Sequence, residues 1–179
     1  MVKVSTLINK TRYFRYTCKT NISMKLKYKS AILCLMLFGL IQFYRPAKNI
    51  QSAINENDFL LTENAPVEIA SLYKKACYDC HSNNTDYSWF DNIAPLSWYV
   101  DSNIKRGVFG LNFSDWKKLT AIDKEIMFSA IPFDIMTDKM PPKKYSLFHP
   151  KAELSNNDKI KMIKWLTEVK LHFLEEEKE

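Results

Sequence analysis

Apolar residues recur at helical spacing over much of the chain after residue 65. One stretch is expected to begin with Asn64 as its N-cap and to run straight into Cys77. Its apolar positions follow the i, i+3, i+4, i+7 pattern of one helix face, namely Ile69, Leu72, Tyr73 and Ala76. The pattern therefore predicts an amphipathic helix that delivers Cys77 to the edge of a core.

The same spacing predicts further helices towards the C-terminus. We expect one over about Leu96 to Val108, one beginning at Ser114 with the Ser114 hydroxyl as its cap, one over about Ile122 to Met136, and a last one beginning at Ser155. Pro132 is expected to bend the third of these. No stretch of any length alternates apolar and polar residues as a strand does. The predicted fold is all-α.

A separate apolar run lies near the N-terminus, where residues 31–44 read AILCLMLFGLIQFY. As a helix this run spans about 21 Å, less than the hydrocarbon core of about 30 Å, although flanking residues bring it near the lower limit. The residues before it include eight Lys or Arg and no Asp or Glu. We expect an uncleaved membrane anchor, in preference to a removed export signal or a buried core helix.

These patterns predict five segments. Residues 1–29 are a basic segment, 30–45 a signal-anchor helix, 46–64 a polar linker, 65–174 the folded domain and 175–179 an acidic tail. Met24 opens a stretch that has the features of a complete export signal by itself. We therefore expect translation to start at Met24, with residues 1–23 as an upstream extension.

The net charge of +6 is unevenly distributed. All 20 acidic residues lie after Lys48, together with only 16 of the 26 Lys and Arg. The folded domain is therefore mildly acidic, which disfavours a nucleic-acid-binding function.

Residues 77–81 read Cys-Tyr-Asp-Cys-His, the spacing of c-type haem attachment. Two thiols three residues apart can form thioethers with the two vinyl groups of one haem. The imidazole of His81 would then reach the iron from the proximal side. The sequence thus predicts one covalently bound haem c at Cys77, Cys80 and His81.

Three other uses of these cysteines are weaker. A zinc site needs two more Cys or His ligands, and only His149 and His172 remain in the domain. A thioredoxin-like redox pair would need a βαβ context, and a structural disulfide would leave His81 without a role. Cys34 is expected to be a small apolar residue and Cys18 a reduced free thiol.

Low-spin haem iron takes a second axial ligand, for which Met140 is the best candidate. Pro141 and Pro142 follow it, so the preceding helix must stop and an extended loop can present the thioether. His149 is the main alternative for this position. The remaining candidates are Met136, His172, Met127 and Met162, and the last two are expected to be core residues. Haem propionates need hydrogen-bond donors, for which Arg106, Trp98 and Tyr145 are candidates.

Three segments, CYDCHSNNTDYSWFDNIAPLSWYV, LNFSDW and KMPPKKYSLFHPKAELS, resemble the haem-binding domain proteins of Bacteroidota-type bacteria. The order of motifs also resembles class I cytochrome c, over roughly residues 70–165. The resemblance implies a class I cytochrome c-like helical domain with Cys77 and Cys80 as thioether sites, His81 as proximal ligand and Met140 as distal ligand. Members often carry His where Asn103 stands here, so no role is transferred to that position.

With both axial positions filled, the iron has no vacant site for substrate. The expected function is therefore outer-sphere electron transfer by a membrane-tethered c-type cytochrome, not catalysis. Its partners would be redox proteins of the cell envelope, and its location the periplasmic face of a bacterial inner membrane or, with the signal removed, the soluble periplasm. The alternatives are a haem-binding module of an envelope complex and a peroxidase-like enzyme or sensor with a labile sixth ligand.

Overall fold

The computed structural model describes residues 25–51 and 55–177, which fall into two compact units. One unit holds the N-terminal residues up to Arg45 together with Ile93–Pro95, and the other holds Pro46–Asn92 and Leu96–Glu179. The expectations for a start at Met24 and for the thiol of Cys18 concern residues outside the described ranges.

The first unit contains a helix over residues 25–41, on which Cys34 is an exposed free thiol. The Gln42 amide joins the two stretches of this unit. Its Nε2 donates to the Ala94 carbonyl at 3.0 Å, and its Oε1 accepts from the Ala94 N–H at 3.0 Å. Within residues 25–51 and 55–177, no helix has both the length and the apolar character needed to cross a membrane.

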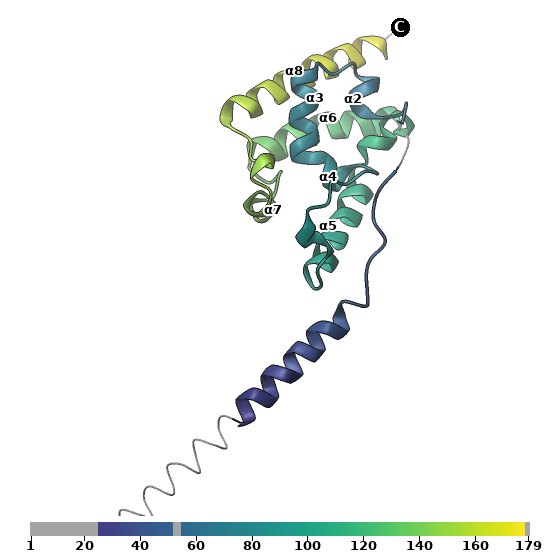
Figure 1. Cartoon of the computed structure of the whole chain (residues 1–179). Coiled ribbons are helices and arrows are strands. Elements are labelled where there is room, and N and C mark those ends of the chain that lie inside the picture. Colours follow the sequence, from purple (N-terminus) through teal and green to yellow (C-terminus); the bar gives the residue numbers. More distant parts are fainter. Residues whose placement is uncertain (1–24, 52–54, 178–179) are drawn as a thin grey trace, which may run out of the picture. The chain divides into compact units, whose positions relative to one another are not determined.

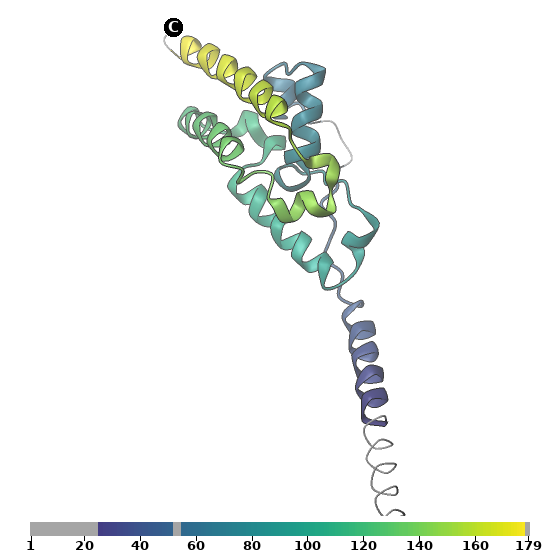
Figure 2. The same cartoon turned by 90° about the vertical axis from the view of Figure 1, so that its left-hand side faces the viewer.

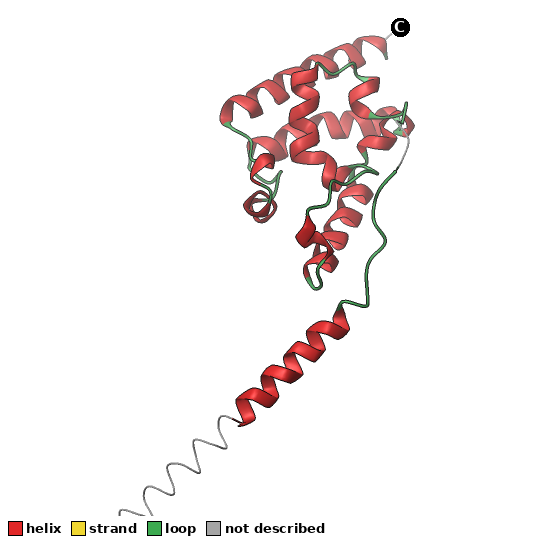
Figure 3. Cartoon of the chain, viewed as in Figure 1, coloured by secondary structure: helices red, strands yellow, loops and turns green. Residues whose placement is uncertain are grey.

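The second unit is built from helices (Figures 1 and 3). In chain order they are α2 (Phe59–Thr62), α3 (Val67–Tyr73), the π-helical turn η1 (Lys74–Tyr78), α4 (Asp79–His81), η2 (Trp89–Asn92), α5 (Leu96–Gly110), η3 (Phe113–Lys118), α6 (Ala121–Met136), α7 (Lys143–Phe148), η4 (Pro150–Ala152) and α8 (Asn156–Glu176). The described residues contain no strand, only an isolated bridge between Ile50 and Asn84. The prediction of an all-α domain is confirmed.

The core lies where α8 packs on α3 and α6, as the two views in Figures 1 and 2 show. Phe59 of α2 is fully buried at its centre. The Phe59 ring lies 4.6 to 5.5 Å, centroid to centroid, from four other aromatic rings, those of Tyr73, Phe113, Trp116 and Trp165. Aromatic packing therefore joins α2, α3, η3 and α8, and fixes the helix that leads to Cys77.

The predicted helices over 96–108 and 122–136 and the one after Ser155 are confirmed as α5, α6 and α8. Ser155 caps α8 in a capping box: its hydroxyl accepts from the Asp158 N–H, and the Asp158 carboxylate accepts from the Ser155 N–H. Pro132 lies inside α6. The C-terminal acidic residues up to Glu176 belong to α8.

Two predicted caps are wrong. Asn64 has a φ of 50° and follows the end of α2, a left-handed conformation that Asn tolerates better than most residues, so it does not cap α3. Asn112, not Ser114, caps η3, since its side chain accepts from the Ser114 N–H. The Ser114 hydroxyl instead accepts from the Asn83 N–H at 3.0 Å.

The stretch expected to be a linker, residues 46–64, contains α2 and the buried Phe59 and Leu60. Its start is also tied to the domain, because the Asn49 side chain donates to the Ser82 carbonyl at 2.7 Å and to the Thr85 hydroxyl at 3.0 Å. The described part of this stretch is therefore integrated into the folded unit.

Candidate functional site

The attachment motif lies at the end of one continuous helical path, in which α3 passes through the π turn η1 into α4. Cys77 lies in η1, whereas Cys80 and His81 lie in α4. Single π turns inside α-helices are rare, and those that do occur are often found at functional sites. The three residues stand at positions i, i+3 and i+4 of this path.

The imidazole of His81 is oriented by the backbone. Its Nδ1 lies 3.0 Å from the carbonyl oxygen of Leu111, the residue that follows α5. A carbonyl can only accept, so Nδ1 must carry the proton, and Nε2 keeps its lone pair. This is the tautomer that an iron ligand requires, held as metal-binding histidines usually are.

The charge state of His81 also suits a ligand. Burial lowers the pKa of His81 below its usual value, and this effect outweighs the opposing contributions of the Leu111 and Gly107 carbonyls and the Asp134 carboxylate. His81 is therefore a neutral imidazole at neutral pH.

Cys77 and Cys80 are free thiols in the structure. Burial, and secondarily the neighbouring Cys80, raises the pKa of Cys77 to about 12. Burial, followed by the carboxylates of Asp79 and Asp91, raises the pKa of Cys80 to about 11. Both groups are thus neutral thiols at pH 7, unlike the reactive thiolates of redox pairs.

A glycine brings α5 against the motif. A Cβ on Gly107 would lie 2.1 Å from the carbonyl oxygen of Cys80, so only glycine allows the two backbones to approach this closely. The contact places the end of α5, and with it the Leu111 carbonyl, beside His81. Gly107 had no assigned role in the sequence, although a glycine inside a predicted helix was the available signal.

An aromatic wall packs against the same motif. The Tyr78 ring is stacked on Phe113, with centroids 5.2 Å apart and planes at 6°, and the His81 ring meets Phe113 edge-on at 6.2 Å. The Tyr78 hydroxyl donates to Asp58 Oδ1 at 2.9 Å. Burial and the Asp58 carboxylate raise the pKa of Tyr78 far above its usual value, so this hydroxyl remains a donor.

Met140 is half-buried in the loop after α6, as predicted. α6 ends through Asp138, whose φ is 56°, and the Met140 N–H then donates to the Asp134 carbonyl at 3.1 Å. The Met140–Pro141 peptide is cis. Asp134 thus contacts the Met140 backbone through its carbonyl, and its carboxylate makes a small upward contribution to the pKa of His81.

The other candidates for the second axial ligand have different surroundings. The ring of His149 stacks on Tyr145, with centroids 4.2 Å apart, and its Nε2 lies 3.3 Å from the Ser88 hydroxyl. His172 is exposed on α8, with Nδ1 3.4 Å from Glu176 Oε1. Met162 is fully buried, Met127 packs against the core and Met136 is exposed.

Two other expectations can be compared with the structure. No group of three or more His, Cys, Asp or Glu in the described parts of the chain could hold a metal ion, so the zinc interpretation gains no support. The Tyr145 hydroxyl, a candidate donor to a propionate, donates instead to Asp79, and Arg106 donates to the Asn103 side chain at 2.6 Å.

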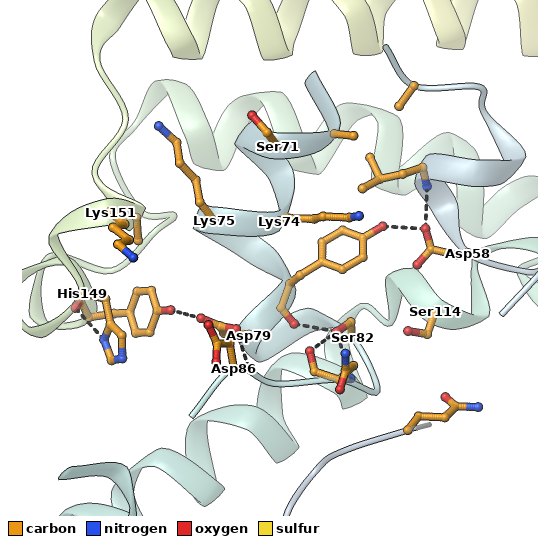
Figure 4. Close-up of a pocket in the computed structure, with 18 of the residues that line it drawn as sticks. Asp58, Ser71, Lys74, Lys75, Asp79, Ser82, Asp86, Ser114, His149 and Lys151 are labelled. Atoms are coloured by element: carbon orange, nitrogen blue, oxygen red, sulfur yellow. Dashed lines mark hydrogen bonds between the residues drawn. The ribbon is translucent and has the colours of Figure 1, made fainter. Parts of the chain in front are cut away.

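A cavity of about 1060 Å³ lies beside the motif, on the side of Tyr78 and Asp79 (Figure 4). Its walls come from α3 and η1, from the segment before α2, and from α7 and η4. Figure 4 shows Lys75, Asp79 and His149 around it. Neither cysteine of the motif lines this cavity, nor do His81 and Met140.

A comparison with protein families matches residues 36–168, more than half of the chain, to a haem-binding domain. The chain belongs to the haem-binding domain family. The comparisons with curated proteins and with solved structures gave no match.

The side chains of this haem-binding domain fit the group that the family name implies. The lone pair of His81 Nε2 is left available by the bond from Nδ1 to the Leu111 carbonyl, and the two neighbouring thiols are unbonded and neutral. The sequence predicted the cysteines, the histidine and Met140 as residues that hold the haem, and these stay predictions. It did not predict the roles of Asp134 and of the Leu111 carbonyl, because a backbone acceptor can come from any residue type. It also gave Gly107 no role, although its place inside a predicted helix was an available signal.

Proposed function

We propose that this haem-binding protein is a c-type cytochrome that carries electrons by outer-sphere transfer. The observation that carries the proposal is the bond between His81 Nδ1 and the Leu111 carbonyl, directly after a Cys-x-x-Cys pair. It sets the tautomer of the proximal ligand before any iron is bound. Haem bound there supplies a one-electron Fe(III)/Fe(II) couple.

Covalent attachment through Cys77 and Cys80 is supported by the state of both thiols. They are three residues apart, free and neutral, and a thiol adds across a vinyl group with its proton going to carbon. A zinc or redox role would call for thiolates instead.

Met140 is proposed as the second axial ligand. It is the methionine on a proline-stiffened loop, and its backbone is held by Asp134. Thioether ligation favours the ferrous state and raises the reduction potential. It also fills the last coordination position, which supports electron transfer over substrate chemistry.

The proposed location is the periplasm, reached through the basic and apolar N-terminal stretch. Its support is the sequence order, in which basic residues precede the apolar run at 31–44 and the acidic residues all follow Lys48. The proposed partners are redox proteins of the cell envelope, and attachment to the membrane through the N-terminal stretch is part of the proposal.

The test is to express the full chain in a host that matures c-type cytochromes and to record its pyridine haemochrome spectrum and intact mass. We expect the mass of one haem to remain on the denatured chain, and to be lost from it when Cys77 and Cys80 are both replaced by Ala. A colourless chain of unmodified mass would contradict the proposal.

The sixth ligand is tested by Met140→Ala against Met136→Ala. Both remove one thioether, but Met136 is exposed at the end of α6 and outside the proposed site. Only Met140→Ala should abolish the far-red band that thioether ligation gives to ferric haem. A high-spin wild-type spectrum that shifts with cyanide would instead favour an enzyme or sensor.

A further inference from the structure

The segment from Met140 to His149 is fastened to the attachment motif at its C-terminal end. The hydroxyl of Tyr145, in α7, donates to Oδ2 of Asp79, which lies between the two cysteines. The other oxygen of Asp79 accepts from the Asp86 N–H at 2.9 Å. The Asp79 carboxylate is therefore oriented from both sides, and one of its partners comes from the Met140 segment.

His149 adds a second attachment. Its ring lies parallel to that of Tyr145, with 4.2 Å between centroids and 14° between planes. The Nε2 of His149 lies 3.6 Å from Asp91 Oδ2, and Asp91 is buried. The Tyr145 ring is thus held between a hydrogen bond to Asp79 and a stacked histidine that is itself paired with a buried carboxylate. Asp79 and His149 both line the cavity and are labelled in Figure 4.

At the N-terminal end of the segment, the Met140 N–H donates to the Asp134 carbonyl. Between the two ends, Pro141 and Pro142 restrict the backbone, and the Tyr145 N–H donates to the Pro142 carbonyl at 2.8 Å. The segment is therefore short, stiff and held at both ends. Such a segment loses little conformational entropy when a side chain within it binds.

We propose that Tyr145 and Asp79 are positioning residues that keep the Met140 segment closed over the haem-attachment motif. This inference rests on the proposed function, in which Met140 ligates the iron. Because a thioether is a weak, neutral ligand, its occupancy depends on how often the loop is in place. The Tyr145–Asp79 hydrogen bond connects that loop directly to the motif that holds the haem.

The test uses the full, haem-loaded chain and the variant Tyr145→Phe. Phenylalanine keeps the ring stacked on His149 and removes only the hydroxyl that Asp79 accepts from. Loss of a hydrogen bond to a charged group should speed hydrogen exchange in peptides covering residues 139–149 by roughly tenfold to a hundredfold. The far-red ferric band of Met140 ligation should weaken in the same variant.

Tyr87→Phe is the matched control. The Tyr87 hydroxyl accepts from the Asn49 N–H at 2.9 Å, and Tyr87 lies outside both the attachment motif and the Met140 segment. The variant should speed exchange around residue 49 and leave both the exchange of residues 139–149 and the far-red band unchanged. Two variants of Asp79 test the acceptor directly. Asp79→Asn keeps an acceptor oxygen and should retain more of the far-red ferric band than Asp79→Ala.

The possible outcomes distinguish the positioning role of Tyr145 from iron ligation by Met140. Unchanged exchange and an unchanged band in Tyr145→Phe would overturn the positioning role, and so would equal changes in Tyr87→Phe. Faster exchange at 139–149 in a protein whose wild type lacks the far-red band would overturn Met140 ligation, and with it this inference as stated. Faster exchange together with a weakened band supports both.

Discussion

Gly107 of α5 and Cys80 of α4 touch backbone to backbone. A Cβ on Gly107 would lie 2.1 Å from the Cys80 carbonyl oxygen and 2.9 Å from its carbonyl carbon. The obstructing atoms belong to the main chain, so no side-chain rotation can relieve the overlap. The same crossing places Leu111, one turn further, where its carbonyl meets His81.

Gly107→Ala should therefore destabilise the domain, although alanine is the better helix former by about 1 kcal/mol. The overlap should outweigh that gain and leave a net loss of about 1–3 kcal/mol in the free energy of unfolding, measured in urea by circular dichroism. Gly110→Ala is the control, because nothing lies within 4 Å of a Cβ there. If both variants unfold at the same urea concentration, the close backbone contact between Gly107 and Cys80 would be contradicted.

Phe59 and Leu61 are neighbours in α2 with opposite environments. Phe59 is fully buried among four aromatic rings, whereas Leu61 is 53% exposed. Phe59→Ala should lower the free energy of unfolding by about 3–5 kcal/mol, because it leaves a cavity in the core. Leu61→Ala should change it far less, which thermal unfolding of the two variants would show. Similar losses would mean that α2 does not insert Phe59 into the core.

The contrast at α2 shows what the sequence could predict and what it could not. α5, α6 and α8 are long enough for the apolar period to identify them, and Ser155 marks the start of α8. α2 has four residues in a polar stretch, too few for a period, so the tertiary contacts of Phe59 decide its structure. The same limit explains the error at Asn64, where a left-handed turn and a helix cap favour the same residue type.

The site divides in a similar way. Cys77, Cys80 and His81 lie within five residues of one another, so their spacing alone predicts haem attachment. Leu111 contributes a carbonyl that any residue could supply, so only the fold identifies it. The link from Tyr145 to Asp79 joins residues 66 positions apart, and neither carries a signal of its own.

Glu63 and Trp116 connect the end of α2 to η3. The indole N–H of the fully buried Trp116 donates to Glu63 Oε1 at 2.6 Å. Glu63→Ala should cost about 1–3 kcal/mol in the free energy of unfolding, since the buried N–H loses its acceptor. Glu63→Gln keeps a side-chain oxygen and should recover much of the loss in the same urea titration. Equal losses in the two variants would show that the carboxylate acts by charge and not as an acceptor.

The thiols of the motif should make the stability of the haem-free chain depend on alkaline pH. The pKa of Cys77 is raised by burial to about 12 and the pKa of Cys80 to about 11, from an ordinary value of 9.0. Above pH 9 the unfolded chain releases these protons while the folded chain retains them. The contribution of the two protonated thiols to the free energy of unfolding is therefore fully present below pH 9. It is lost as the pH rises towards 12, by an amount on the order of a few kcal/mol.

Urea titrations between pH 8 and pH 11 would measure this loss for the haem-free chain and for a variant with both Cys77 and Cys80 replaced by Ala. Buried tyrosines such as Tyr73, whose pKa is raised mainly by burial and secondarily by Cys77, contribute in the same direction to both chains. The difference between the chains therefore reports the thiols together with their effect on these tyrosines. The alanine variant should lose less stability over this range. The haem-loaded wild type should resemble the alanine variant in its pH slope, because a thioether sulfur has no proton to release. A haem-loaded chain with the full slope of the haem-free one would show that the sulfurs are still thiols, and would exclude covalent attachment.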